Sequence, residues 1–231
     1  MTICGGMARG KHMRVTRLDE CGIPVEGTTS IVNTTGFILV TDTANYLDPE
    51  DITQANANGD LCVDDQSDPA LRWMDLEIQL CNIDPDLITL MTGDPLVVND
   101  ATPTPESVGY RIDSALTGTG NFALEVWSGV PSEVCSGGFP MYGYHLFPWV
   151  KQARYSERSV QNAPYQVALT ARTQAGSGWG VGPYDIRRDA TVPATLEPLL
   201  TAIGPNQHYH FQFADAPLPT PACGFTELTI P

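Results

Sequence analysis

The chain has 231 residues, of which 42% are hydrophobic and 17% charged, and its formal net charge is −15 at pH 7. A protein that grips nucleic acid neutralises phosphates with Lys and Arg, so this acidic balance argues against ordinary nucleic-acid binding. No apolar run approaches the roughly 20 residues of a membrane-spanning helix, and the N-terminus lacks the apolar region of a secretory signal.

Gly and Pro are frequent, at 21 and 19 residues. This composition favours many short strands joined by turns, and the length allows a single β domain. The charge is uneven: the first eighteen residues carry four bases and no acid, whereas residues 19–106 carry eighteen acids against Arg72 alone. Simple solubility explains an acidic excess. A basic N-terminus beside an acidic body also suggests self-association.

The first half of the chain begins with two predicted strands, at residues 13–19 and 31–41. Residues 49–56 read as a short helix, because Asp48 suits the N-cap and Pro49 the first helical position. The stretch QANANGDLCVDD (54–65) imitates a calcium-binding loop only in part, since its first position is Gln and its twelfth is Asp.

The spacing of apolar residues changes halfway through the segment DLEIQLCNIDPDLITLMTG (75–93). Before Asp84, apolar and polar residues alternate, which predicts a half-buried strand over residues 73–82. Asp84 suits an N-cap, Pro85 the first helical position, and Gly93 a left-handed C-cap, so a helix is predicted at residues 85–92. Such a unit places one short helix against a sheet.

The second half of the chain continues the mainly β pattern. Another short helix is predicted after Thr195, because Leu196, Leu199, Leu200 and Ile203 have helical spacing. Residues 101–106 and 214–224 are Pro-rich and predict extended loops or arms. The remaining predicted strands lie at residues 108–113, 122–128, 142–149, 165–173 and 207–213.

The search for chemistry finds no active site. GSGWGVGP (176–183) lacks the last glycine of the dinucleotide pattern. His208 and His210 share a strand face, but a polar face explains them better than a metal site. None of the six cysteines forms a CxxC pair, and Cys62 and Cys81 read as small core residues. We therefore expect no catalytic residue, no cofactor and no metal ligand.

Several segments occur in order along the chain: MRVTRLDECGIPVEG (13–27), NANGDLCVDD (56–65), DLEIQLCNIDPDLITLMTG (75–93), FALEVWSGV (122–130) and VALTARTQAGSGWGVGPY (167–184). In their order and spacing these segments resemble those of the major tail tube proteins of siphophages that infect actinobacteria. Siphophages are bacteriophages with long, non-contractile tails. The resemblance covers most of residues 13–184 and fades toward the C-terminus. None of the segments is a catalytic signature.

The resemblance implies a mainly β fold, a tail-tube-like β-sandwich or barrel flanked by one main short α-helix, with extended N- and C-terminal arms. The chain then divides into an N-terminal arm at residues 1–12, a tail-tube β domain at 13–213 and a C-terminal extension at 214–231. The implied protein is structural and not an enzyme.

The resemblance also implies partners. Copies of the chain would form hexameric rings that stack into a hollow tube around a tape-measure protein, between tail terminator and baseplate proteins. Phage DNA would pass through the bore without specific binding. The protein would reside in the virion tail after assembly in the host cytoplasm, with no membrane span.

Physical arguments suggest which residues would serve such an assembly. A carboxylate-lined bore lets phosphates pass without sticking, and Asp75, Glu77 and Glu125 lie on polar faces of predicted strands, so we expect them to face the bore. Between rings, we expect bases of the N-terminal arm to meet the acidic stretch. The residues expected at that inter-ring contact are Arg9, Lys11, Asp48, Asp51, Asp64 and Asp65.

Two alternatives stay open. In the first, the chain is another ring-forming tail or baseplate component of the same fold. In the second, it is a β-sandwich that binds carbohydrate, either as a binding module or as a hydrolase. In the second case Trp127, Trp149 and Trp179 would form an exposed aromatic platform. A core or subunit-interface position is the interpretation we favour for these tryptophans, since such contacts are rich in aromatic residues.

Overall fold

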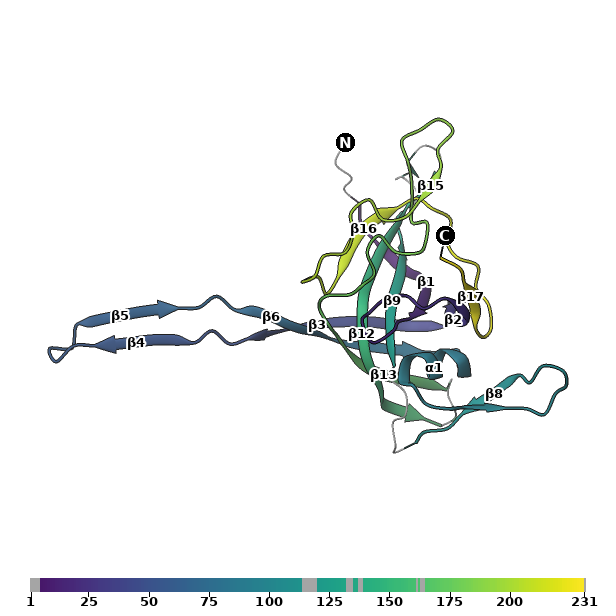
Figure 1. The fold of residues 1–231 in the computed structure, drawn as a ribbon, viewed down its shortest axis with the longest axis horizontal. Helices are drawn as coiled ribbons and strands as arrows, with labels where there is room; N and C mark the ends of the chain where they lie inside the picture. Colours follow the sequence, from purple (N-terminus) through teal and green to yellow (C-terminus); the bar gives the residue numbers. More distant parts are fainter. Residues whose placement is uncertain are drawn as a thin grey trace.

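The computed structural model describes residues 5–113, 120–131, 135–136, 139–160, 162 and 165–230. It is mainly β, as the sequence predicts, and these described residues contain one short helix, as the resemblance implies (Figure 1). Nine strands belong to one sheet: β1 Ala8–Arg17, β2 Gly27–Thr34, β3 Phe37–Leu47, β6 Ala70–Leu80, β9 Asn121–Gly129, β12 Tyr142–Ser159, β13 Gln166–Thr173, β16 His210–Ala214 and β17 Thr226–Leu228. Their order is β17-β2-β1-β9-β12-β13-β6-β3, with β16 also paired to β12, and the pairs are antiparallel.

Four small two-stranded sheets and a helix complete the described elements. Their bounds are β4 Asp51–Ala55 with β5 Leu61–Gln66, β7 Leu96–Val98 with β8 Ser107–Tyr110, β10 Cys135–Ser136 with β11 Phe139–Pro140, β14 Arg187–Arg188 with β15 Leu196–Glu197, and α1 Pro85–Thr92. The β4–β5 and β7–β8 pairs both project from the body of the molecule.

The large sheet curls around a first hydrophobic core. β3 is the last strand in the order, yet Gly10 of β1 lies directly against the ring of Phe37 in β3. Alternation along β6 fills this core, because successive side chains of a strand point to opposite faces. Its inward residues are Leu76, Ile78 and Leu80, and its outward residues are Asp75, Glu77 and Gln79.

Helix α1 has the predicted bounds and covers this core. The Asp84 carboxylate accepts the backbone N–H of Asp86 at 3.0 Å, and Pro85 stands at the first position. At the other end Gly93 has φ of 81° and its N–H donates to the carbonyl oxygen of Thr89, which forms the expected left-handed cap. The buried face of α1 packs into the core.

A second core lies on the opposite face of β9 and β12. Trp127 of β9 and Trp149 of β12 pack there with Trp179 and Ile186 from the segment that follows β13. β9 is consequently buried on both faces along almost its whole length. A strand in this position has no solvent-facing side, whatever its alternation suggests.

The predicted helix at residues 49–56 is wrong, because this stretch forms β4 and the start of a turn. The Asn56 side chain accepts the N–H groups of Asn58 and Asp60, and Gly59 has φ of 86°. These local bonds close a hairpin onto β5. Asp48 and Pro49 are helix-start signals, but a short helix is marginal without a surface to pack on.

The predicted helix after Thr195 is also wrong. Leu199 and Ile203 are buried as its pattern suggests, yet their N–H groups donate to the carbonyl oxygens of Val181 and Gly180. Leu196 pairs with Arg188 in the β14–β15 bridge. Hydrogen bonds to a distant segment thus replace those of a helix while the apolar side chains still reach the second core.

Cys62 and Cys81 are not core residues, contrary to the sequence interpretation. Both are exposed with free thiols, as are Cys21 and Cys223. Cys62 lies on β5, where no second layer covers either face, and Cys81 follows the last residue of β6. Strand alternation predicts burial only where another layer exists.

Both predicted terminal arms are partly built into the sheet. β1 begins at Ala8, so the predicted boundary at residue 12 falls inside a strand. In the C-terminal segment β17 pairs with β2, and the N–H groups of Gly224 and Phe225 donate to the carboxylates of Asp84 and Asp86. The start of α1 therefore anchors the C-terminal segment.

Candidate functional site

A long two-stranded arm is the most distinctive feature of the molecule. Strands β3 and β6 continue beyond the part of β6 that pairs with β13, and β4 and β5 prolong them to a turn near Asn58. We define residues 46–71 as the arm. At about 3.3 Å per residue, two antiparallel passes of this length reach about 40 Å. Figure 1 shows the arm standing clear of the body.

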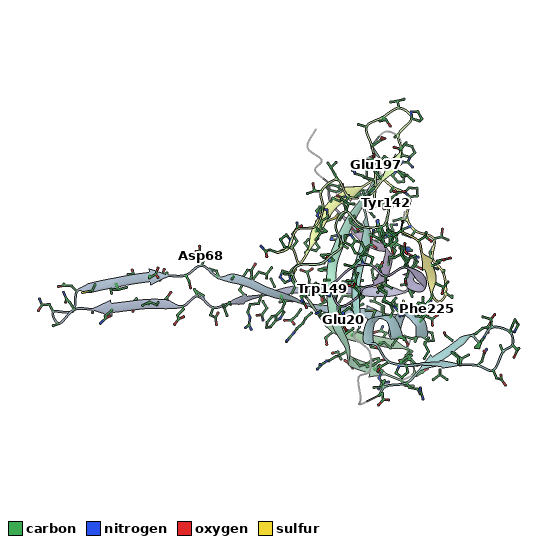
Figure 2. The ribbon with its side chains drawn as sticks, in the orientation of Figure 1. Glu20, Asp68, Tyr142, Trp149, Glu197 and Phe225 are labelled. Atoms are coloured by element: carbon green, nitrogen blue, oxygen red, sulfur yellow. The ribbon has the colours of Figure 1, made fainter. Side chains whose placement is uncertain are left out.

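The arm is strongly acidic. It contains no Lys, Arg or His, and its seven acids are Asp48, Glu50, Asp51, Asp60, Asp64, Asp65 and Asp68. Strands β4 and β5 are exposed throughout, and Figure 2 shows Asp68 far from the body (Figure 2). Four acids of the predicted inter-ring contact therefore gather on this one element. In the described part of the chain, no ion pair reaches any of the seven.

The arm also exposes apolar side chains. Tyr46, Leu47, Ile52, Leu61 and Val63 are each between 44% and 61% exposed. An isolated two-stranded ribbon is marginally stable in water, and an apolar surface of this kind marks interaction sites. The arm therefore has the properties of an element that is completed by a partner.

The second candidate feature is a hollow on the outward face of the sheet, at the root of the arm. It has a volume of about 1040 Å³ and is lined by β3, β6, β12 and β13. Two cross-strand rows form its floor. One row runs through Thr43, Asp75, Arg172 and Lys151, and the next through Thr41, Glu77, Thr170 and Arg154. Bases from β12 and β13 thus face acids from β6.

The predicted bore acids Asp75 and Glu77 both lie in this hollow. Asp75 accepts from Arg172 Nε at 2.9 Å and from Trp73 Nε1 at 3.1 Å, while Glu77 accepts from Gln79 at 2.8 Å. The hollow is not a purely acidic surface, because its lining also includes four bases. These are Arg72, Lys151, Arg154 and Arg172. Sequence reasoning missed them as a group because three come from strands far along the chain.

The expectation that Glu125 lies on an open strand face is wrong. Glu125 is fully buried beneath the second layer, and its two carboxylate oxygens accept from Arg14 at 2.5 and 2.6 Å. Tyr144 donates to the same carboxylate at 2.7 Å. The Arg14 guanidinium also lies over the ring of Tyr184, at 3.3 Å from its centroid. The charge is therefore neutralised inside the fold.

The electrostatics of this cluster favour an ionised pair. Burial disfavours the charged guanidinium, but attraction from Glu125 and the hydrogen bonds to it outweigh burial, so the pKa of Arg14 is raised. Burial also raises the pKa of Tyr144 well above its usual value, so its hydroxyl keeps the proton that it donates. The cluster ties β1, β9 and β12 together, and it has no solvent access for a reaction.

The predicted basic partners Arg9 and Lys11 lie on β1, and both are exposed. Here β1 pairs with β9 through two register shifts, and Arg9 adopts a φ of 59°. Irregular strand ends of this kind turn side chains outward. Their contact with an acidic segment of another copy stays a prediction.

One arrangement resembles a nucleophile and its base. His145 Nε2 lies 3.2 Å from Ser128 Oγ and Nδ1 lies 2.7 Å from the Tyr209 hydroxyl, beside a groove of about 270 Å³. Ser128 Oγ donates to the carbonyl oxygen of Gly143. The network is satisfied when Tyr209 donates to Nδ1 and Nε2–H donates to Ser128. In that tautomer Nε2 of His145 carries a hydrogen and does not accept the Ser128 proton.

The aromatic platform of the carbohydrate alternative is not present. Trp127, Trp149 and Trp179 are only 3–6% exposed and belong to the second core. Trp73 remains partly exposed in the lining of the hollow, and the guanidiniums of Arg72 and Arg172 both lie over its ring. Its cation–π contacts hold these two bases in place.

Comparisons with known proteins do not identify the chain. No protein-family model matches it, and no curated protein matches it significantly. Across the described residues, no helix is long and apolar enough to cross a membrane. In the same residues, no three His, Cys, Asp or Glu side chains form a group able to hold a metal ion. The arm and the hollow are therefore the features from which a function can be inferred.

Proposed function

We propose that the chain is a structural virion subunit that assembles with itself into stacked, hexameric rings, and that these form the hollow tail tube of a siphophage. The observation that carries this proposal is the arm. A ribbon of about 40 Å with two uncovered faces and several exposed apolar side chains has no structural purpose in a monomer. It acquires one when a neighbouring subunit covers it.

The margins of the sheet also support self-assembly. β3 is the last strand in the sheet order, and no strand among the described residues pairs with the backbone groups of its outer edge. Ile38 and Leu39 on this strand are exposed. Long, uncovered edges of this kind promote aggregation in a monomer, but in a ring they pair with the next subunit. The resemblance of the sequence to tail tube proteins points to the same kind of assembly.

The proposal includes the remaining partners. The tube surrounds a tape-measure protein, meets tail terminator and baseplate proteins at its ends, and delivers phage DNA without specific binding. The protein has no enzymatic role, and it resides in the virion tail after assembly in the bacterial cytoplasm. The high net negative charge supports passage of DNA, because phosphates are repelled rather than held.

Electron microscopy tests the proposal directly. Purified full-length protein should form rings or hollow tubes in negative stain, and sedimentation should show that their share grows with protein concentration. A protein that stays a single monomeric species up to millimolar concentration contradicts the proposal. Rings without tubes would still support the assembly but favour a terminal ring component over the tube itself.

A further inference from the structure

We propose that the hollow receives the acidic arm of a second copy of the chain. This inference rests on the proposed function, because it names one contact within the assembly. The hollow is the surface lined by Arg72, Trp73, Lys151, Arg154 and Arg172 together with the acids of β6. The arm is residues 46–71, as defined above.

Charge complementarity is the first reason. The hollow contains Arg72 and Lys151 beside the ion pair of Arg172 with Asp75, whereas the arm contains seven acids and no base. Arg72 and Lys151 lie over the rings of Trp73 and Trp149, and no carboxylate in the described part of the chain lies within ion-pair distance of either. Both partners therefore carry charges that are uncompensated in the single chain.

The occupant must come from another copy. Thr43 and Trp73 in the lining mark the root of the arm, from which the ribbon runs away from the body. A straight two-stranded ribbon does not fold back onto its own root. The arm and the hollow are different surfaces of one chain, so their contact is heterologous, and such contacts propagate into rings or filaments.

The chemistry of the hollow favours a polypeptide. Its volume of about 1040 Å³ lies at the upper limit of the usual 300–1,000 Å³ of small-molecule sites. Asp75 and Glu77 oppose a continuous phosphate backbone, because their negative charges repel phosphates and phosphate carries no donor to offset this. The arm supplies donors beside its carboxylates, in the side chains of Thr53, Gln54 and Gln66.

The contact changes the expected location of two acids. The sheet face that contains Asp75 and Glu77 becomes an interface between subunits and not the wall of the bore. Four bases on a bore wall would bind the phosphates of passing DNA and slow it. In the interface the same bases are covered by carboxylates of the neighbouring arm.

Reciprocal charge reversal tests the contact in the full-length protein. The arm variant is Asp64→Lys with Asp65→Lys, and the hollow variant is Arg72→Glu with Lys151→Glu. Each alone should lose rings and tubes and sediment as a folded monomer. Mixed together, the two variants should assemble again, because the lysines introduced in one arm meet the glutamates introduced in the other variant's hollow. The second contact in the mixture joins a natural arm to a natural hollow.

Three controls distinguish the outcomes. Asp100→Lys with Glu106→Lys changes the charge equally on the exposed β7–β8 loop and should assemble normally. Arg9→Glu with Lys11→Glu tests the rival contact, and restored assembly on mixing it with the arm variant would overturn the inference. Binding of duplex DNA is the third control. If the natural protein retains duplex DNA and the hollow variant does not, the hollow is a nucleic-acid site and the inference is wrong.

Failure of the inference is separable from failure of the proposed function. If the natural protein forms no assembly under any condition, the proposed function fails. If it assembles but both reversal variants also assemble, or if their mixture does not, only the contact between arm and hollow is wrong. Assembly should in addition weaken when salt is raised, because screening acts on exposed charges.

Discussion

The burial of Glu125 could not be predicted from the local sequence pattern. In NFALEVW the acid sits among alternating apolar residues, and a half-buried strand would place it in solvent. A second layer covers that face, however, and Arg14 stands opposite in the β1–β9 register. A buried carboxylate persists only when it is paired and hydrogen-bonded, and here Arg14 and Tyr144 meet both needs.

Removing one partner of this pair should destabilise the protein strongly. Glu125→Gln keeps the shape of the side chain but leaves the buried Arg14 cation without a counter-charge, and we expect a loss of about 3–5 kcal/mol in the free energy of unfolding. Urea unfolding followed by tryptophan fluorescence measures it. The double variant Arg14→Met with Glu125→Leu is the control and should lose much less. A loss below about 1 kcal/mol for Glu125→Gln would contradict a buried ion pair.

Helix α1 shows that a single element can be read from the sequence when its caps are local. Asp84, Pro85 and Gly93 mark both ends, and each makes the predicted contribution. The structure adds one role that the sequence does not reveal. Asp84 uses its second carboxylate oxygen to accept the N–H of Gly224 at 2.7 Å, so the cap also holds the C-terminal segment.

Asp84→Ala should therefore cost more than an ordinary exposed substitution. Loss of the N-cap bond alone costs about 1 kcal/mol, with an upper range near 2, and the loss of the Gly224 bond adds to it. Thermal or urea unfolding gives the magnitude, and proteolysis should cut near residue 224 more readily. Asp100→Ala, on an exposed loop, is the matched control and should stay within about 0.5 kcal/mol of the natural protein.

The turn between β14 and β15 has its own titratable anchor. The Asp189 carboxylate accepts from the backbone N–H of Thr195 at 2.7 Å and from the hydroxyls of Thr191 and Thr195. The Thr195 backbone bond is the main cause that lowers the pKa of Asp189 to about 2. Because the pKa is depressed on folding, the turn is stabilised above the unfolded value near 4 and loses this support as pH falls through about 2.

Carbon-detected NMR titration of the side-chain carboxyl should place the midpoint of Asp189 near pH 2. Thr195→Val removes one hydroxyl donor and should move the midpoint upward, whereas the natural backbone bond keeps it below the ordinary value. A midpoint near 4 in the natural protein would show that the turn does not hold the carboxylate in solution.

At the scale of the whole molecule, the arm separates folding from assembly. The body has two cores, and the arm contributes to neither. Leu47 and Ala70 are paired across the ribbon, so an Asn-Gly turn can join them in place of residues 48–69. Such a replacement would remove most of the arm and leave both cores unchanged.

This truncated variant should fold but not assemble. Its melting temperature should stay within a few degrees of the natural protein, because an isolated two-stranded ribbon adds little stability. Sedimentation and negative-stain microscopy should show a monomer at concentrations where the natural protein forms rings or tubes. Assembly of the truncated variant into normal tubes would contradict the proposed role of the arm.

The sequence by itself determined the β class, most strand positions and helix α1, because alternation and capping depend on neighbours within a few residues. It also placed Asp51, Asp64 and Asp65 in one acidic stretch. Only the tertiary structure decided that this stretch forms a projecting hairpin, that Glu125 is buried, and that bases of β12 and β13 join Asp75 in one hollow. Those facts depend on which layers cover a strand and which distant strands pair with it, and no local pattern encodes either.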